Sequence, residues 1–183
     1  MILTEFGTVT AADTVRFDRL LPGPIERVWA FLTEPEKRAQ WLAGGPMDMR
    51  VGGKVELHFR NSDLSPQSEP VPERYKQYEN VTTHGRITRC EPPRLLSYTW
   101  GGEPVGGESE VSFELSPQGD KVRLVVVHRR LRDRKSMVSV GSGWHIHLGI
   151  LADRLSGREP GRFWSAIAEA EAEAEYEKRL AQG

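Results

Sequence analysis

The alternation of apolar and polar residues predicts a series of β-strands before residue 130. Lys54 to Arg60 is the clearest example, with Val55, Leu57 and Phe59 alternating against charged and polar residues. Because successive side chains of a strand point to opposite faces of a sheet, the pattern predicts one buried and one exposed face. The same periodicity predicts strands at 14–21, 47–51, 81–90, 94–100, 110–116 and 121–129. We expect about six or seven antiparallel strands, with Gly52-Gly53 forming a hairpin turn between the second and third.

A different spacing predicts three helical regions around these strands. Ile25 to Thr33 carries apolar residues at helical intervals after Pro24, and Pro35 to Trp41 forms a second short helix that begins on its proline. Gly143 to Leu155 places one apolar stripe along a helix, made of Trp144, Leu148, Leu151 and Leu155. A lone amphipathic helix that follows a set of antiparallel strands typically lies across them, because the apolar face of a sheet needs a second layer.

The C-terminal region predicts one more helix, at Arg162 to Gln182. Its alternation of Ala and Glu has the period of a strand, but both residues favour helices. Ile146 and Ile150 lie opposite the Trp144 stripe, so the Gly143–Leu155 helix needs a second cover. Phe163, Trp164 and Ile167 could supply it from the same chain or from a second copy, and we expect a homodimer contact through these C-terminal helices. The chain then divides into an N-terminal segment (1–13), one domain (14–157) and a C-terminal helical extension (158–183).

Composition narrows the class of protein. The chain has 183 residues, of which 38% are hydrophobic and 28% charged, and its net charge is −1. This balance is typical of a globular protein and gives no reason to expect binding to nucleic acid. We expect neither a membrane-inserted segment nor a targeting peptide, and a single cysteine fits a reducing compartment. The simplest localisation is therefore cytoplasmic.

An ordered set of motifs carries a family resemblance over roughly residues 14–156. The set comprises Pro24-x-Glu26-x-Val28-Trp29, Leu32-Thr33-x-Pro35, Trp41, Gly52-Gly53, Gly85, Pro92-Pro93-x-Leu95, Tyr98-x-Trp100 and Gly143-Trp144-x3-Leu148-x2-Leu151. It resembles the homologues of the activator of heat-shock-protein-90 ATPase, in the START and birch-pollen-allergen (SRPBCC) superfamily. The resemblance implies an α+β helix-grip fold, in which a curved antiparallel sheet wraps around a long C-terminal helix and two short helices follow the first strand. The segment after Gly157 and the loop at 61–80 look like additions to that fold.

The resemblance also implies a cavity between the sheet and the C-terminal helix. The inward residues of the predicted elements would line it: Trp41, Leu57, Phe59, Leu96, Tyr98, Trp100, Phe113, Leu124, Val126, His128, Trp144, Leu148 and Leu151. Apolar walls with a few polar tips are typical of a site for a small molecule, so the leading hypothesis is a small hydrophobic or aromatic ligand. The same residues, taken singly, also fit an ordinary core.

Candidates for chemistry are few. His128 shares the inward face with Leu124 and Val126, and could be a buried structural histidine, a ligand contact or a general base. His145 and His147 cannot bind one metal ion from a helix, because residues two apart point in different directions, and we expect no metal or cofactor. Glu108 and Glu110 are expected to be solvated charges.

Two functional alternatives stay open beside ligand binding. The resemblance to cyclase and aromatase relatives permits an enzyme that acts on a bound hydrophobic compound, with His128 and Tyr98 as acid–base candidates. The resemblance to the ATPase activator permits a protein-interaction module. The polar stretch at 61–80 has three prolines and no periodicity, and loops of that length are often lids or binding loops.

Overall fold

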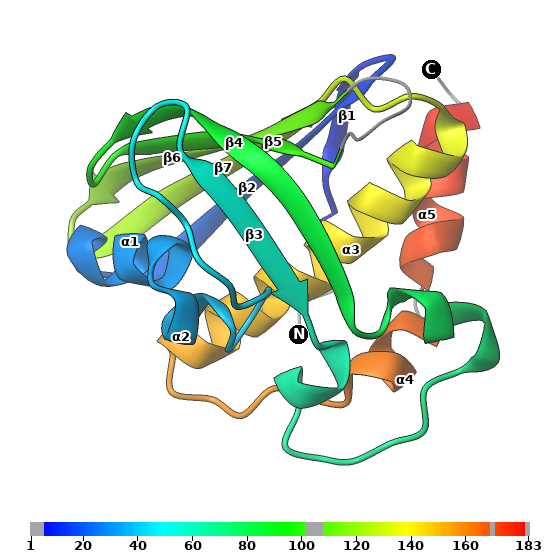
Figure 1. Ribbon diagram of the computed structural model, residues 1–183. Helices are drawn as coiled ribbons and strands as arrows, with labels where there is room; N and C mark the ends of the chain where they lie inside the picture. Colours follow the sequence, from blue (N-terminus) through cyan, green and yellow to red (C-terminus); the bar gives the residue numbers. More distant parts are fainter. Residues whose placement is uncertain (1–5, 102–107, 169–170, 182–183) are drawn as a thin grey trace.

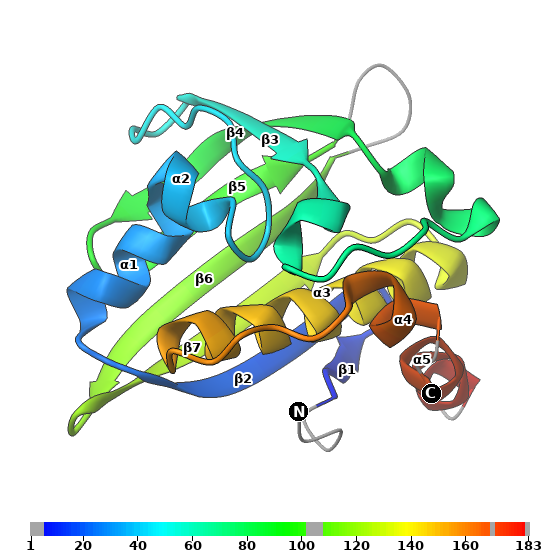
Figure 2. The same ribbon diagram turned by 90° about the horizontal axis from the view of Figure 1, so that it is seen from below.

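A computed structural model describes residues 6–101, 108–168 and 171–181. Within these residues, a seven-stranded antiparallel sheet has the strand order β1-β2-β7-β6-β5-β4-β3. Helix α3 runs across one face of this curved sheet, and α1 and α2 lie over the same face near one end (Figures 1 and 2). The strands are β1 (Thr8–Ala11), β2 (Thr14–Pro22), β3 (Lys54–Phe59), β4 (Val81–Glu91), β5 (Leu95–Trp100), β6 (Ser109–Gln118) and β7 (Lys121–Arg129). The predicted α+β helix-grip fold is therefore confirmed.

The inner strand faces follow the predicted alternation. Val111, Phe113 and Leu115 of β6 and Val122, Leu124, Val126 and His128 of β7 are all buried. Pairing brings Phe113 opposite Val126 and Val111 opposite His128, so the two inward faces pack side by side. The apolar face formed in this way is the surface that α3 covers.

The strand predicted at Met47–Val51 is wrong. This stretch forms one isolated bridge to β3, which joins Met47 and Val55. The seventh strand is instead β1, within the N-terminal segment that the sequence analysis divided from the domain. Its four residues, Thr-Val-Thr-Ala, form a short alternation that is mostly exposed, which is why the sequence pattern gave little signal for it.

Helices α1 (Ile25–Thr33) and α2 (Pro35–Arg38) are linked by a buried guanidinium. Arg38 is fully buried, and it donates hydrogen bonds to the carbonyl oxygens of Thr33, Ala43 and Gly45. Burial lowers the pKa of this side chain from its ordinary value. The three carbonyl groups compensate the buried charge and fix the chain as it turns from α2 towards β3.

Helix α3 (Arg134–Leu155) begins nine residues before the predicted start at Gly143. Its N-cap is Asp133, whose carboxylate accepts a hydrogen bond from the Ser136 backbone at 2.8 Å. The first half contains serine and glycine, which are weak helix formers, so the sequence pattern underestimated its length. Burial of Met137, Val138 and Gly141 shows that tertiary packing outweighs that propensity.

The C-terminal region forms α4 (Phe163–Ala168) and α5 (Glu171–Ala181), where one helix was predicted. Both helices contact α3 on the side away from the sheet, as Figure 2 shows. Phe163 and Trp164 are buried, as is Ile146, so the chain covers the second face of α3 with its own C-terminal region. Ile167 was predicted to contribute to this cover, but its side chain is not among those that the structure describes. Exchange of these helices with a second copy stays a prediction.

The stretch between β3 and β4 is anchored at several points. It contains two 3-10 helices, η1 (Asn61–Leu64) and η2 (Glu73–Tyr78). Trp164 Nε1 donates to Ser62 Oγ at 2.9 Å, and Arg154 of α3 donates to the Leu64 carbonyl oxygen at 3.1 Å. These hydrogen bonds hold the inserted segment against α3 and α4.

Helix α5 also fixes the N-terminal strand. The Gly7 backbone N–H donates to the hydroxyl of Tyr176 at 2.6 Å, and Arg179 donates to the Gly7 carbonyl oxygen at 3.2 Å. Tyr176 is fully buried, with its ring also close to Gly141 of α3. The two ends of the chain therefore stabilise one another.

We predict that Tyr176→Phe lowers the free energy of unfolding by about 1–2 kcal/mol, because it leaves the buried Gly7 N–H without its acceptor. Urea denaturation of the full chain measures this change. Tyr78→Phe is the control, since the Tyr78 side chain is 45% exposed and its replacement should change stability by less than about 0.5 kcal/mol. Equal stability of the two variants would contradict the proposed role of Tyr176.

Candidate functional site

An inner pocket of about 340 Å³ lies between the sheet and α3. Aromatic rings form much of its wall: the ring centroids of Trp100 and Trp144 are 5.5 Å apart, and those of Phe59 and Trp100 are 5.7 Å apart. The complete lining is Leu42, Phe59, Asn61, Tyr78, Val81, Thr83, Trp100, His128, Ser139, Val140, Gly143, Trp144 and His147. Apolar walls with a small number of polar groups are typical of sites for small molecules.

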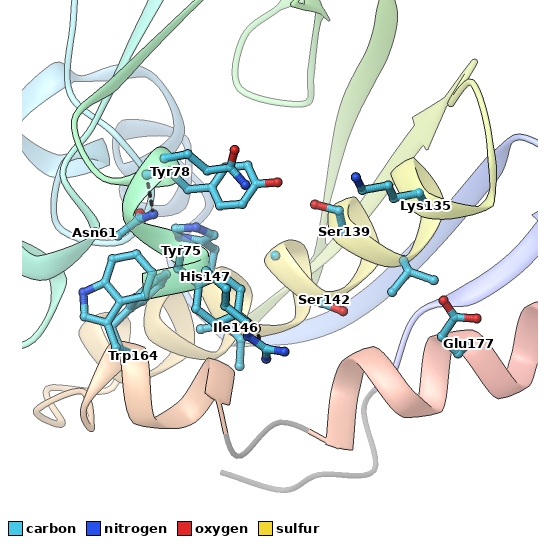
Figure 3. Close-up of a pocket in the computed structure, with 15 residues that line it drawn as sticks. Asn61, Tyr75, Tyr78, Lys135, Ser139, Ser142, Ile146, His147, Trp164 and Glu177 are labelled. Carbon is cyan, nitrogen blue, oxygen red and sulfur yellow. Dashed lines mark hydrogen bonds between the residues drawn. The ribbon is translucent and has the colours of Figure 1, made fainter. Parts of the chain in front are cut away.

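An outer pocket of about 390 Å³ adjoins the first. It lies between α3, α4 and the inserted segment, and it shares Asn61, Tyr78, Ser139, Gly143 and His147 with the inner pocket. Figure 3 shows Asn61, Tyr75 and His147 on one side of the outer pocket and Lys135 and Glu177 on the other. The inserted segment at 61–80 therefore contributes to the walls of both pockets.

His128 is fully buried, and both of its ring nitrogens are hydrogen-bonded. Trp144 Nε1 donates to His128 Nδ1 at 2.9 Å, so the ring proton lies on Nε2, which is 2.8 Å from Ser109 Oγ. The Ser109 hydroxyl in turn donates to the Trp100 carbonyl oxygen at 3.1 Å. Burial lowers the pKa of His128 to about 3, so the ring is neutral at pH 7. This chain of hydrogen bonds favours the structural interpretation of His128 over a role as general base.

Tyr98 does not join His128 at the pocket. It is buried against Trp100 and Phe113, and burial raises its pKa above the ordinary value. The acid–base pair expected for a cyclase-like enzyme is therefore not assembled at either pocket.

Four of the thirteen predicted lining residues reach the inner pocket: Phe59, Trp100, His128 and Trp144. The other nine pack in the hydrophobic core and line neither pocket: Trp41, Leu57, Leu96, Tyr98, Phe113, Leu124, Val126, Leu148 and Leu151. The alternation of side chains along a strand identifies which residues point inward. It cannot distinguish those packed against α3 from those that border the pocket.

His147 was not among the predicted site residues, yet it lines both pockets. Its Nδ1 lies 2.8 Å from the Trp41 carbonyl oxygen, and because a carbonyl only accepts, Nδ1 carries the proton. Burial lowers the pKa of His147 to about 4, although the bond to Trp41 works in the opposite direction. The ring is therefore neutral at pH 7, with an unprotonated Nε2.

Gly143 lies in the middle of α3 and lines both pockets. Apart from the neighbouring helix backbone, no atom lies within 4 Å of the position that a Cβ would take. A glycine inside a helix costs roughly 0.5–1 kcal/mol relative to alanine. Here its missing side chain keeps the junction of the two pockets open.

Glu108 and Glu110, which were predicted to be solvated charges, line neither of these two pockets. Glu110 is buried, contrary to the prediction of a solvated charge, and it accepts a hydrogen bond from Arg129 Nε at 2.8 Å. Although burial acts the other way, the hydrogen bonds from Arg129 and Thr88 hold the Glu110 pKa below its ordinary value. Glu108 is exposed. In the described part of the chain, no group of three His, Cys, Asp or Glu is placed to hold a metal ion.

The curved sheet, the long helix across it and the pocket between them define a helix-grip protein. Residues 22–156 match the sequence model of the family described as "Activator of Hsp90 ATPase homolog 1-like protein". The chain belongs to this family, since the match covers more than half of its length. A comparison with functionally curated proteins finds no match. No helix among the described residues is long and apolar enough to cross a membrane.

Solved structures support the same fold. A Bordetella parapertussis protein, encoded by gene BPP1335, is 47% identical, with a TM-score of 0.78 over 96% of this chain and 92% of its own. CalU16 from Micromonospora echinospora is 25% identical, with a TM-score of 0.68 over 91% of this chain and 88% of its own. DynU16, from the dynemicin biosynthetic locus, is 23% identical, with a TM-score of 0.64 over 84% of this chain and 51% of its own.

The buried side chains of His128 and His147 predict a loss of stability in mild acid. Their folded pKa values of about 3 and about 4 lie below the unfolded value of 6.5, so the unfolded chain binds more protons as the pH falls through 6.5. The contribution of these histidines to stability is fully present above that pH. Near pH 6 the free energy of unfolding should fall by about 2 kcal/mol for each pH unit of acidification.

Urea denaturation between pH 5.5 and 7.5 measures this slope, in a range where carboxylates remain largely ionised. His147→Asn should reduce the slope by about half, because the amide nitrogen replaces Nδ1–H but does not titrate. A flat profile in the wild-type protein would contradict the assignment of two buried neutral histidines.

Proposed function

We propose that this protein binds a small hydrophobic or aromatic molecule in the inner pocket, between the sheet and α3. The single observation that carries the proposal is the open space beside Gly143, where aromatic rings form the wall and no side chain fills the centre. Burial of an apolar ring contributes roughly 25 cal/mol for each Å² removed from water, so such a pocket favours an apolar ligand over water.

The position of the aromatic side chains supports the proposal. Trp100 comes from β5 and Trp144 from α3, and each ring is held by a neighbouring side chain. The His128 ring holds the Trp144 indole through its N–H, and the stack on Tyr98 holds the Trp100 ring. Rings fixed in this way lose little conformational entropy when a ligand binds, which favours affinity.

The inserted segment at 61–80 supports ligand selection at the pocket mouth. Tyr78 lines both pockets, although its side chain is 45% exposed, and Asn61 lies beside it with its amide nitrogen 3.4 Å from the Tyr78 carbonyl oxygen. Binding loops carried on a rigid scaffold commonly determine specificity. We assign this role to the segment.

Gly143→Leu tests the proposal through two opposite effects. Replacement of a helical glycine should raise the free energy of unfolding by about 0.5–1 kcal/mol, because helix propensity improves and the added Cβ meets no atom within 4 Å. The new side chain occupies the ligand's space and should weaken binding of N-phenyl-1-naphthylamine, followed by its fluorescence, by about tenfold or more.

Gly161→Leu is the matched control, because it adds the same side chain to an exposed loop where no atom lies within 4 Å of the Cβ position. It should bind the probe as the wild-type protein does. Absence of probe binding to the wild-type protein, or equal binding to Gly143→Leu, would overturn the proposed function. A protein that binds no apolar probe and stimulates chaperone ATP hydrolysis would point to the protein-interaction alternative.

A further inference from the structure

The junction of the two pockets presents hydrogen-bond acceptors without matching donors. His147 Nδ1 donates to the Trp41 carbonyl oxygen, which leaves Nε2 as a lone-pair acceptor on the same ring. No hydrogen bond to Nε2 is present among the residues that the structure describes, and the ring lines both pockets. A neutral imidazole in this tautomer can only accept a hydrogen bond at Nε2.

Asn61 adds a second acceptor at the same junction. Its Nδ2 faces the Tyr78 carbonyl oxygen, and because that oxygen only accepts, the amide cannot be turned around. The Asn61 side-chain oxygen Oδ1 is buried and has no hydrogen-bond partner within the described part of the chain. Asn61 is only 7% exposed, so water has little access to this oxygen. A buried acceptor without a donor costs about 1–3 kcal/mol.

Aromatic rings flank the His147 ring at this junction. The Phe59 ring lies 6.2 Å from the His147 ring, and the Phe163 ring lies 5.4 Å from it on the other side. A ligand that reaches the junction must therefore fit between rings and at the same time present a hydrogen-bond donor. A carboxylate or ketone offers no such donor, whereas a neutral aromatic hydroxyl satisfies both requirements.

We propose that the pocket selects an aromatic ligand with a hydroxyl group of the phenol type, whose O–H donates to His147 Nε2 while its ring lies in the inner pocket. This assignment rests on the proposed function and names the chemical class of the ligand at that site. His147 is then a specificity-determining residue. The His147 ring is held in the required tautomer and orientation by the backbone of Trp41.

Two probes of nearly equal shape test the assignment. 2-Naphthol carries the O–H donor, and 2-methoxynaphthalene replaces it with a methyl ether. The wild-type protein, titrated by quenching of its tryptophan fluorescence at pH 7, should bind 2-naphthol about fivefold more tightly, the value of one net hydrogen bond. In His147→Asn, which keeps a donor for Trp41 but lacks Nε2, the ratio of the two affinities should fall to about one. His84→Asn, on the exposed side of β4, should keep the wild-type ratio.

Each outcome supports the assignment or overturns it. Equal binding of both probes by the wild-type protein overturns the donor assignment while the proposed function stands, and binding of neither probe overturns both. A preference for 2-naphthol that survives in His147→Asn also overturns the assignment. If that variant does not fold, the imidazole ¹⁵N signals of the wild-type protein decide the matter: the Nε2 signal of His147 should move with 2-naphthol and stay in place with 2-methoxynaphthalene.

Discussion

Helix α3 must bury apolar side chains on two opposite faces, and the rest of the structure depends on how this requirement is met. Trp144, Leu148 and Leu151 are buried on one side and Ile146 on the other, so the helix needs the sheet and the C-terminal helices together. Packing between α3 and the sheet is incomplete beside Gly143, which lacks a side chain to fill the space. The same helix therefore serves as the main element of the core and as the wall of the pocket.

The fold could be predicted in large part because the strands carry strong periodic signals. Periodicity identifies the inward faces of β6 and β7 and the two short helices, and burial of His128 follows from strand parity. The remaining features depend on contacts between distant residues. Gly7, next to strand β1, is held by Tyr176 from the C-terminal region, and the first half of α3 is stabilised by packing rather than by propensity. No local pattern records such contacts.

The site could be predicted only in outline. The expected cavity lies between sheet and helix, but several of its polar groups come from α3 and the inserted segment, where the alternation of strand residues gives no information. His128 is hydrogen-bonded at both nitrogens, whereas His147 projects Nε2 towards the junction only because the Trp41 carbonyl holds its other nitrogen. Gly143 was a usable signal in the sequence. A glycine within a helix lowers helix stability, so its presence indicates a position where a side chain would occupy needed space.

The central claim is that a ligand occupies the inner pocket, whose wall includes the rings of Trp100 and Trp144. The chain has five tryptophans, so a ¹H–¹⁵N spectrum of the indole groups provides five separate reporters. During titration with 2-naphthol, the account predicts saturable shifts of the Trp100 and Trp144 signals, while Trp29, on α1 and outside both pockets, stays in place. Unchanged Trp100 and Trp144 signals at saturating ligand, or shifts confined to Trp29, would contradict it.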